Sequence, residues 1–104
     1  MIEKRKAIRS KAIRASAEGE NCALCGLNDG TTVFCHLNEG WAGKGMAQKA
    51  DDFGLYGCLT CHNNMDGRNG IRAIPETWEI LRACYRTWRR LVEKNIIQIK
   101  DYKA

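Results

Sequence analysis

Four cysteines are the residues whose type and spacing most clearly predict chemistry in this chain. They form two Cys-x-x-Cys pairs, Cys22 with Cys25 in NCALCG and Cys58 with Cys61 in CLTCHNNMD. Each pair can present two thiolates to one ion, and two pairs complete the tetrahedral shell that zinc prefers. The spacing therefore predicts one structural zinc ion, whose four thiolate ligands leave no open position for catalysis.

The second cysteine pair has two other interpretations. Cys-x-x-Cys-His is the pattern that attaches a c-type haem, and Cys-x-x-Cys is also a thioredoxin-like redox motif. Haem attachment takes place outside the cytosol, and residues 1–20 contain no apolar segment typical of a signal peptide. A haem would also leave the first cysteine pair without a role. A redox dithiol needs a βαβ setting that the sequence does not predict, so zinc is favoured over both.

The two histidines, His36 and His62, are the next candidates for chemistry. Either one alone is more often a structural residue than a functional one. Here, however, His36 falls between the cysteine pairs, and His62 directly follows Cys61 at the start of a predicted helix. If zinc holds that helix against the segment of His36, both imidazoles can face one cleft. Asp66 lies four residues after His62, hence on the same helical face.

The elements that must position these residues follow from composition. EKRKAIRSKAIRASA has helix formers and no glycine or proline, which predicts a short basic helix over 3–17 that packs weakly or orders on a partner. β-branched and aromatic residues predict short strands, and the segment after the second cysteine pair predicts a short helix. The predicted elements are strands at 31–37 and 53–57, a loop at 38–52 and a helix at 60–68.

Helical periodicity is clearest after Pro75, which can occupy the first turn of a helix. Apolar residues recur there every three or four positions over about five turns. The pattern predicts a long amphipathic helix whose apolar stripe packs in the core. The stripe consists of Trp78, Leu81, Cys84 or Tyr85, Trp88, and Leu91 or Val92.

Charge is distributed unevenly along the 104 residues, whose formal net charge is +5. Both ends of the chain are basic, and the cysteine-bearing centre is slightly acidic. We therefore expect a single domain with a basic N-terminal helical arm at 1–20, a zinc-bound core at 21–70 and a C-terminal helix at 71–104. Basic ends are typical of proteins that bind nucleic acid, although solvated helix faces have a similar composition.

The remaining composition bears on location. No run of eighteen apolar residues is present, so no membrane span is predicted. Paired cysteines without a predicted export signal are typical of metal-binding proteins in a reducing compartment. We therefore expect a cytoplasmic protein.

The ordered set of motifs resembles the zinc-bearing HNH endonucleases, also called ββα-metal or His-Me finger nucleases. It is most similar to the small prophage-encoded YbcO-like proteins, through KAIRASAEGENC, TTVFCHL and CLTCHNNMD, over about residues 10–70. The resemblance implies an α+β fold in which a small zinc-stabilised ββα-metal core carries an N-terminal basic helix and a long C-terminal amphipathic helix.

The resemblance also implies a function, the metal-dependent hydrolysis of phosphodiester bonds in DNA. His36 would act as the general base, for which a neutral imidazole is suited. His62, together with Asp66, would hold a catalytic divalent ion, Mg²⁺ or Mn²⁺, that stabilises the scissile phosphate. The residues expected to contact phosphate are Lys44, Lys49 and Arg68.

One position departs from the family pattern. Many HNH enzymes have an acidic metal ligand directly before the base histidine, whereas this chain has Cys35 there. A thiol is a poor ligand for a hard ion such as Mg²⁺. Either Asp66 supplies the carboxylate, or the ion is softer, or the site is inactive. The sixth cysteine, Cys84, is interpreted as a small buried hydrophobic residue.

Two other classes of function remain open at this point. A non-catalytic zinc module that binds nucleic acid would share the zinc and the basic ends, but would need neither His36 nor a second metal. A protein-interaction module would dock a partner through the Trp- and Arg-rich C-terminal helix. The sequence also leaves open the structure of the substrate, recruitment by a recombination protein, and whether the chain is a monomer or a homodimer.

Overall fold

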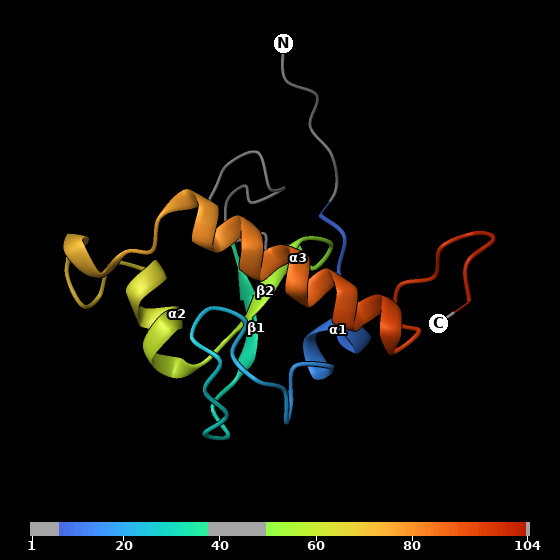
Figure 1. The fold of residues 1–104 in the computed structure, drawn as a ribbon, viewed down its shortest axis with the longest axis horizontal. Helices are drawn as coiled ribbons and strands as arrows, with labels where there is room; N and C mark the ends of the chain where they lie inside the picture. The colour runs from blue at the N-terminus through green and yellow to red at the C-terminus, as the bar shows by residue number, and fades with distance from the viewer. Residues whose placement is uncertain (1–6, 38–49, 104) are drawn as a thin grey trace, which may run out of the picture.

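The polypeptide folds as an α+β structure around one small antiparallel sheet (Figure 1). The computed structural model describes residues 7–37 and 50–103. Within these residues, three α-helices and a short 3-10 helix accompany a two-stranded sheet. In chain order the elements are α1 (Lys11–Ala15), β1 (Val33–His36), β2 (Gly54–Gly57), α2 (Leu59–Met65), η2 (Ile71–Ala73) and α3 (Thr77–Glu93).

The strands β1 and β2 lie within the two segments whose composition predicted them. They pair antiparallel, with Cys35 opposite Leu55 and His36 opposite Gly54. Position 54 has no room for a side chain, because a Cβ atom there would lie 2.7 Å from the Phe34 ring. The Phe34 ring therefore lies flush against the strand and meets His36 edge-to-face, with 5.5 Å between ring centroids.

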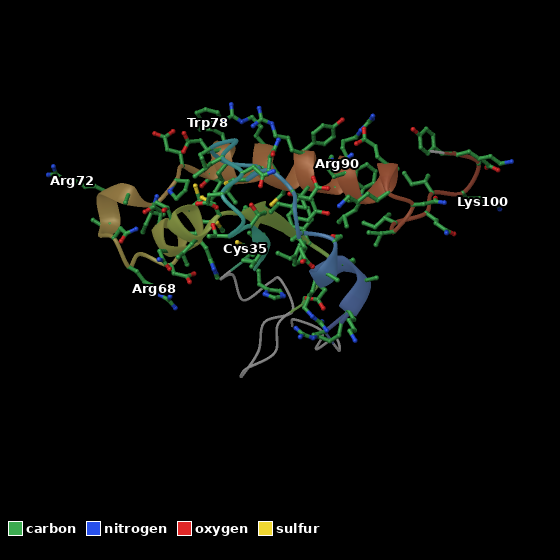
Figure 2. The ribbon with its side chains drawn as sticks, turned by 90° about the horizontal axis from the view of Figure 1, so that it is seen from below. Cys35, Arg68, Arg72, Trp78, Arg90 and Lys100 are labelled. Carbon is green, nitrogen blue, oxygen red and sulfur yellow. The ribbon has the colours of Figure 1, made fainter. Side chains whose placement is uncertain are left out.

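Helix α3 lies along one face of the sheet (Figures 1 and 2). The approach is close, because the backbone N–H of Tyr56 in β2 donates a hydrogen bond of 2.8 Å to Thr87 Oγ1. Only short or slim side chains fit between a helix and a strand at this distance. The buried residues of α3 are Ala83, Cys84, Thr87, Leu91 and Val92.

The apolar stripe predicted for this helix is therefore wrong in part. Trp78, Leu81 and Tyr85 are 55%, 62% and 59% exposed, and Trp88 is half-buried. The last turn and Cys84 are buried as predicted. Two helical faces carry apolar residues at suitable spacing, and the tight contact with the sheet selects the face with the smaller side chains.

Helix α1 is shorter than the helix predicted over 3–17. It begins after Ser10, whose Oγ accepts a hydrogen bond of 3.2 Å from the Ile13 N–H. Ser10 itself is extended, and the carbonyl of Ile8 accepts a hydrogen bond of 2.7 Å from the Asp51 N–H. The chain before α1 is thus pinned to the segment that leads into β2, which prevents an earlier start of the helix.

The end of α1 and the segment that follows are bonded to the last turn of α3. The Arg90 guanidinium contacts both carboxylate oxygens of Glu20, at 3.1 and 3.0 Å, and Lys94 forms an ion pair with the same carboxylate. Lys94 Nζ also donates to the Ser16 carbonyl at 2.8 Å. Burial opposes ionisation of Glu20, but these cations outweigh it and hold the pKa below its ordinary value of 4.5. Contrary to expectation, α1 is therefore firmly docked.

The hydrophobic core contains residues from the beginning, middle and end of the chain. The buried core cluster comprises Ile13, Ala17, Ala23, Phe34, Cys35, Leu37, Leu55, Tyr56, Ala83, Cys84 and Leu91.

Within the described residues, no helix is long and apolar enough to cross a membrane. The domain boundaries expected at residues 20 and 70 stay predictions.

Candidate functional site

The four cysteines of the predicted zinc site form one cluster. Their sulfur atoms all lie within 4.8 Å of one another, and all but Cys25 are buried. The sulfurs of Cys25 and Cys58 are 3.8 Å apart. Two ligands of a tetrahedral zinc ion with bonds of about 2.3 Å lie about 3.8 Å apart. The type and spacing of the donors therefore fit a structural zinc ion.

The first cysteine pair lies in a turn that directs backbone N–H groups at sulfur. The Cys25 N–H lies 3.4 Å from Cys22 Sγ, and Gly26 reverses the chain with a φ of +82°. Burial alone would raise the pKa of the Cys22 thiol, but backbone hydrogen bonds at Cys25, Cys58 and Leu24 outweigh it and lower the pKa to about 7. Because the thiolate is the metal-binding form, this turn is suited to a zinc ligand.

The second cysteine pair joins the sheet to α2. Cys58 directly follows β2 and is extended, and α2 begins at the next residue. Cys61 is the buried residue of α2. An ion held by both pairs would fix the start of α2 to the first cysteine turn. It would thereby set the direction of His62, which is adjacent in the chain.

At the end of β1, His36 bonds a carboxylate that the sequence analysis did not single out. Its Nε2 lies 2.7 Å from Oδ1 of Asp51, which is 0% exposed. An ionised carboxylate can only accept hydrogen bonds, so His36 Nε2–H donates and the lone pair of the ring lies on Nδ1. The structure thus shows a partly exposed imidazole with one tautomer favoured by a buried carboxylate.

The segment before and within α1 holds Asp51 in place. The Ser10 N–H donates to Asp51 Oδ2 at 2.7 Å, and the Arg14 guanidinium bonds the same oxygen. Arg9 Nε lies 3.7 Å from it. Burial opposes ionisation of Asp51, but hydrogen bonds from Ser10, His36 and Arg14 outweigh it and hold the pKa below its ordinary value of 3.8. Asp51 is therefore ionised at neutral pH.

One signal in the sequence could have identified Asp51. In an antiparallel pair, the residues just before the second strand lie beside the end of the first. The doublet Asp51–Asp52 precedes β2, and His36 ends β1. Pairing of the two predicted strands as a hairpin brings a carboxylate near His36. The doublet falls in the loop predicted at 38–52, so this contact was not predicted.

His62 in α2 and Asp66, the residue directly after its end, lie on one side of the helix, as their spacing predicted. His62 Nε2 is 3.6 Å from Asp66 Oδ2, which is an ion-pair distance rather than a hydrogen bond. Both side chains are partly exposed. Arg68 Nη2 lies 3.9 Å from the same Asp66 oxygen, and its side chain is mostly exposed.

The described contacts thus place the predicted site residues in three groups. These are the cysteine cluster, His36 with Asp51, and His62 with Asp66 and Arg68. A shared cleft for the two imidazoles stays a prediction. Lys44 and Lys49 lie outside the described residues.

Cys35, which directly precedes His36, is a core residue. It is 0% exposed, its Sγ lies 3.9 Å from the Gly57 carbonyl oxygen, and burial raises the pKa of its thiol to about 12. A neutral thiol in this position is not placed to act as a metal ligand. The carboxylate beside His36 is contributed by Asp51 instead. Cys84 is buried as predicted, and burial raises the pKa of its thiol to about 11.

A protein-family model described as "Putative nuclease YbcO" matches residues 11–95. The chain belongs to the YbcO family. The YbcO match begins at α1 and ends just after α3, so it includes all four clustered cysteines, both histidines and Asp51. No curated protein and no solved structure matches the chain.

In this YbcO-family chain, the cysteine cluster, the His36–Asp51 pair and the His62–Asp66 pair differ in the chemistry that they allow. Four thiolates around zinc are coordinatively complete and therefore structural. An imidazole with its lone pair on Nδ1 can accept a proton, and its buried carboxylate partner stabilises the resulting cation. A histidine and an aspartate on one helical turn can bind a divalent cation. Together they can serve as a proton acceptor, a candidate ion site and a scaffold.

Proposed function

We propose that this protein is a metal-dependent endonuclease that hydrolyses phosphodiester bonds of DNA, with an HNH-type, ββα-metal site. Membership of a nuclease family supports the class of reaction. The order β1, β2, α2, with cysteine pairs before β1 and after β2, is the element order expected of a zinc-bearing ββα-metal core. The His36–Asp51 hydrogen bond is the single observation that carries the proposal.

His36 acts as the general base. Its Nδ1 accepts a proton from the attacking water, while Nε2–H keeps its hydrogen bond to Asp51. Asp51 does not take the proton. It orients the ring, and its negative charge stabilises the imidazolium that forms. Asp51 can do this at neutral pH because its own hydrogen bonds keep it ionised.

His62 and Asp66 provide the ligands for the catalytic ion. When bound, a Mg²⁺ or Mn²⁺ ion would supply charge stabilisation of the scissile phosphate and the leaving oxygen. Arg68, close to Asp66, and Arg9, close to Asp51, place positive charge beside each candidate group. Positive charge at these places favours the approach of a phosphate backbone.

Plasmid nicking with added Mg²⁺ or Mn²⁺ tests the proposal. We expect the zinc-loaded wild type to convert supercoiled plasmid to the open form. His36→Ala should reduce the rate by at least about 100-fold, the usual contribution of a general base. The same loss is expected from His62→Ala. A matched control is Tyr102→Ala, an exposed residue outside every element described, which should leave the rate unchanged.

Binding measurements separate the possible outcomes. Retained DNA binding by His36→Ala with loss of nicking supports the endonuclease. If the wild type binds DNA but does not nick it with any divalent ion tested, the non-catalytic zinc module becomes the better explanation. If nicking persists in His36→Ala at the wild-type rate, the assignment of the base is wrong.

A further inference from the structure

The outward face of α3 carries three bulky apolar side chains that the core does not use. Trp78, Leu81 and Tyr85 are each more than half exposed. Their spacing of three and four residues puts them on one side of the helix. Trp78 and Tyr85 are about 10 Å apart along the axis, at about 1.5 Å per residue. Exposed apolar side chains grouped on one face indicate a binding surface.

Guanidinium groups lie among these rings. The Arg82 guanidinium lies over the Trp78 ring, 5.0 Å from its centroid, and forms no salt bridge with the described residues. Trp78 Nε1 donates a hydrogen bond of 2.6 Å to Glu76, whose side chain also closes the capping box of α3. The ring is thus held on the surface. Arg89, seven residues after Arg82, lies on the same helical side.

The basic surface continues from α3 around one end of the molecule. Figure 2 shows Trp78, at the start of α3, then Arg72 and then Arg68 in turn around that end. Arg72 is exposed and, within the part of the chain that the structure describes, has no salt-bridge partner. Arg68 is the residue 3.9 Å from Asp66. Arg72 and Arg68 thus lie between the α3 face and one of the candidate groups around this end of the molecule.

Charge and shape favour one occupant for this face. A second copy would bring two arginine-rich faces together, which is unfavourable for chains that each have a net charge of +5. Flat rings interleaved with guanidinium groups are how proteins hold single-stranded nucleic acid, because bases stack on the rings and phosphates meet the cations.

We propose that the outward face of α3 binds an unpaired DNA strand, with bases stacked on Trp78 and Tyr85 and phosphates beside Arg72, Arg82 and Arg89. The inference rests on the proposed function only in taking DNA as the substrate. It adds a substrate class: DNA with a single-stranded segment next to the point of cleavage. The strand would run from the α3 face past Arg68 toward Asp66.

Fluorescence anisotropy with a labelled single-stranded oligonucleotide, and with the same sequence as a duplex, tests this inference. The zinc-loaded full chain is used without added Mg²⁺ or Mn²⁺, so that cleavage does not interfere. Trp78→Ala and Tyr85→Ala should each weaken single-strand binding about tenfold, the effect of losing one stacked base. Duplex binding should change less than about twofold in both variants. Trp78→Phe, which keeps a flat ring, should restore most of the affinity.

The control is Tyr102→Ala, which removes a tyrosine of similar exposure away from α3 and should leave single-strand affinity unchanged. Equal single-strand affinities of wild type and Trp78→Ala would overturn the inference. So would a wild-type dimer, seen in sedimentation, that Trp78→Ala converts to a monomer, because the face would then hold a second copy.

The readouts distinguish this inference from the proposed function. If plasmid nicking fails while single-strand binding still depends on Trp78, the endonuclease proposal is wrong and the binding-face proposal is supported. If nicking succeeds while Trp78→Ala binds single strands normally, the binding-face proposal is wrong and the endonuclease proposal is supported.

Discussion

At the scale of single residues, the pairing of His36 with Asp51 decides what the candidate site can do. A surface imidazole without a partner would exchange between tautomers, and its lone pair would have no fixed direction. Here the buried carboxylate of Asp51 accepts a hydrogen bond from His36 Nε2–H. That carboxylate in turn accepts hydrogen bonds from Ser10 and Arg14. In the proposed mechanism, the imidazole is consequently oriented for proton transfer before any substrate binds.

Asp51→Asn tests this pairing with little change in shape. The amide cannot stabilise an imidazolium, so we expect nicking to slow by at least about 100-fold. It also loses charged hydrogen bonds, which should lower the free energy of unfolding by about 2 kcal/mol at neutral pH. Thermal melting and plasmid nicking measure the two effects. Wild-type nicking by Asp51→Asn would show that the carboxylate has no role in catalysis.

The acid dependence of stability gives an independent check on Asp51. A carboxyl whose pKa is lowered on folding stabilises the protein fully above its unfolded pKa, and this stabilisation is lost as the pH falls through the folded pKa. The difference in stability between wild type and Asp51→Asn should therefore shrink as the pH falls below about 3.8. Melting curves below that pH measure it, and a difference that grows there would contradict the sign.

At the scale of elements, the contact between α3 and the sheet explains both what prediction from sequence could do and where it failed. Strand and helix segments were predictable because their local composition and period suffice to identify them. The buried face of α3 was not predictable. Trp78 and Leu81 are more apolar than Ala83 and Thr87 and so are expected to be buried, but the short distance between α3 and β2 leaves room only for the smaller pair. Hydrophobicity ranks side chains by transfer from water, whereas a tight contact ranks them by size.

The same distinction between local and long-range information applies to the candidate site. The four cysteines were found from spacing alone, because zinc chemistry restricts which residue types can serve. Asp51 was missed, because its role depends on strand register and on α1, which are long-range features. His62 and Asp66 needed only the helical repeat.

The sheet offers a test at this scale. A Cβ atom on Gly57 would lie 2.8 Å from Cys35 Sγ, so Gly57→Ala should lower the free energy of unfolding by about 2 kcal/mol through overpacking. Cys35→Ala removes the obstructing sulfur, and the double variant should recover part of that loss. Denaturant unfolding of the two single variants and the double variant measures the coupling. Strictly additive effects would mean that the clash is relieved elsewhere.

At the scale of the whole molecule, both a metal ion bound by the cysteine cluster and the hydrophobic core are expected to stabilise the fold. The sheet has two short strands, which are only marginally stable alone. The cysteine cluster connects the turn before β1 to the start of α2, so an ion bound there closes a loop of more than thirty residues. Structural zinc can contribute about 10 kcal/mol or more, which is comparable to the whole stability of a small domain.

Removal of zinc by a chelator should therefore unfold the protein and abolish nicking, and added Mg²⁺ alone should not restore activity. Circular dichroism and zinc-to-protein ratio measure the first effect, with a ratio of one expected before chelation. Cys58→Ser should resemble the chelated wild type. Cys84→Ala, a cysteine change outside the cluster, should keep the full zinc ratio. A chelated chain that keeps its melting transition would show that the cluster does not support the fold.

The bonds of Glu20 and Ser16 to Arg90 and Lys94 have a consequence for the order in which the protein becomes functional. Ribosomes make the chain from its N-terminus, so α1 emerges long before the helix turn that anchors it. Until that last turn has been synthesised, α1 and the segment after it lack their bonds to Arg90 and Lys94, and the segment that holds the Asp51 carboxylate is less firmly fixed. A chain that ends before this turn would therefore lack part of the support for Asp51 and His36, and the proposed DNA cleavage would arise only once α3 has been made.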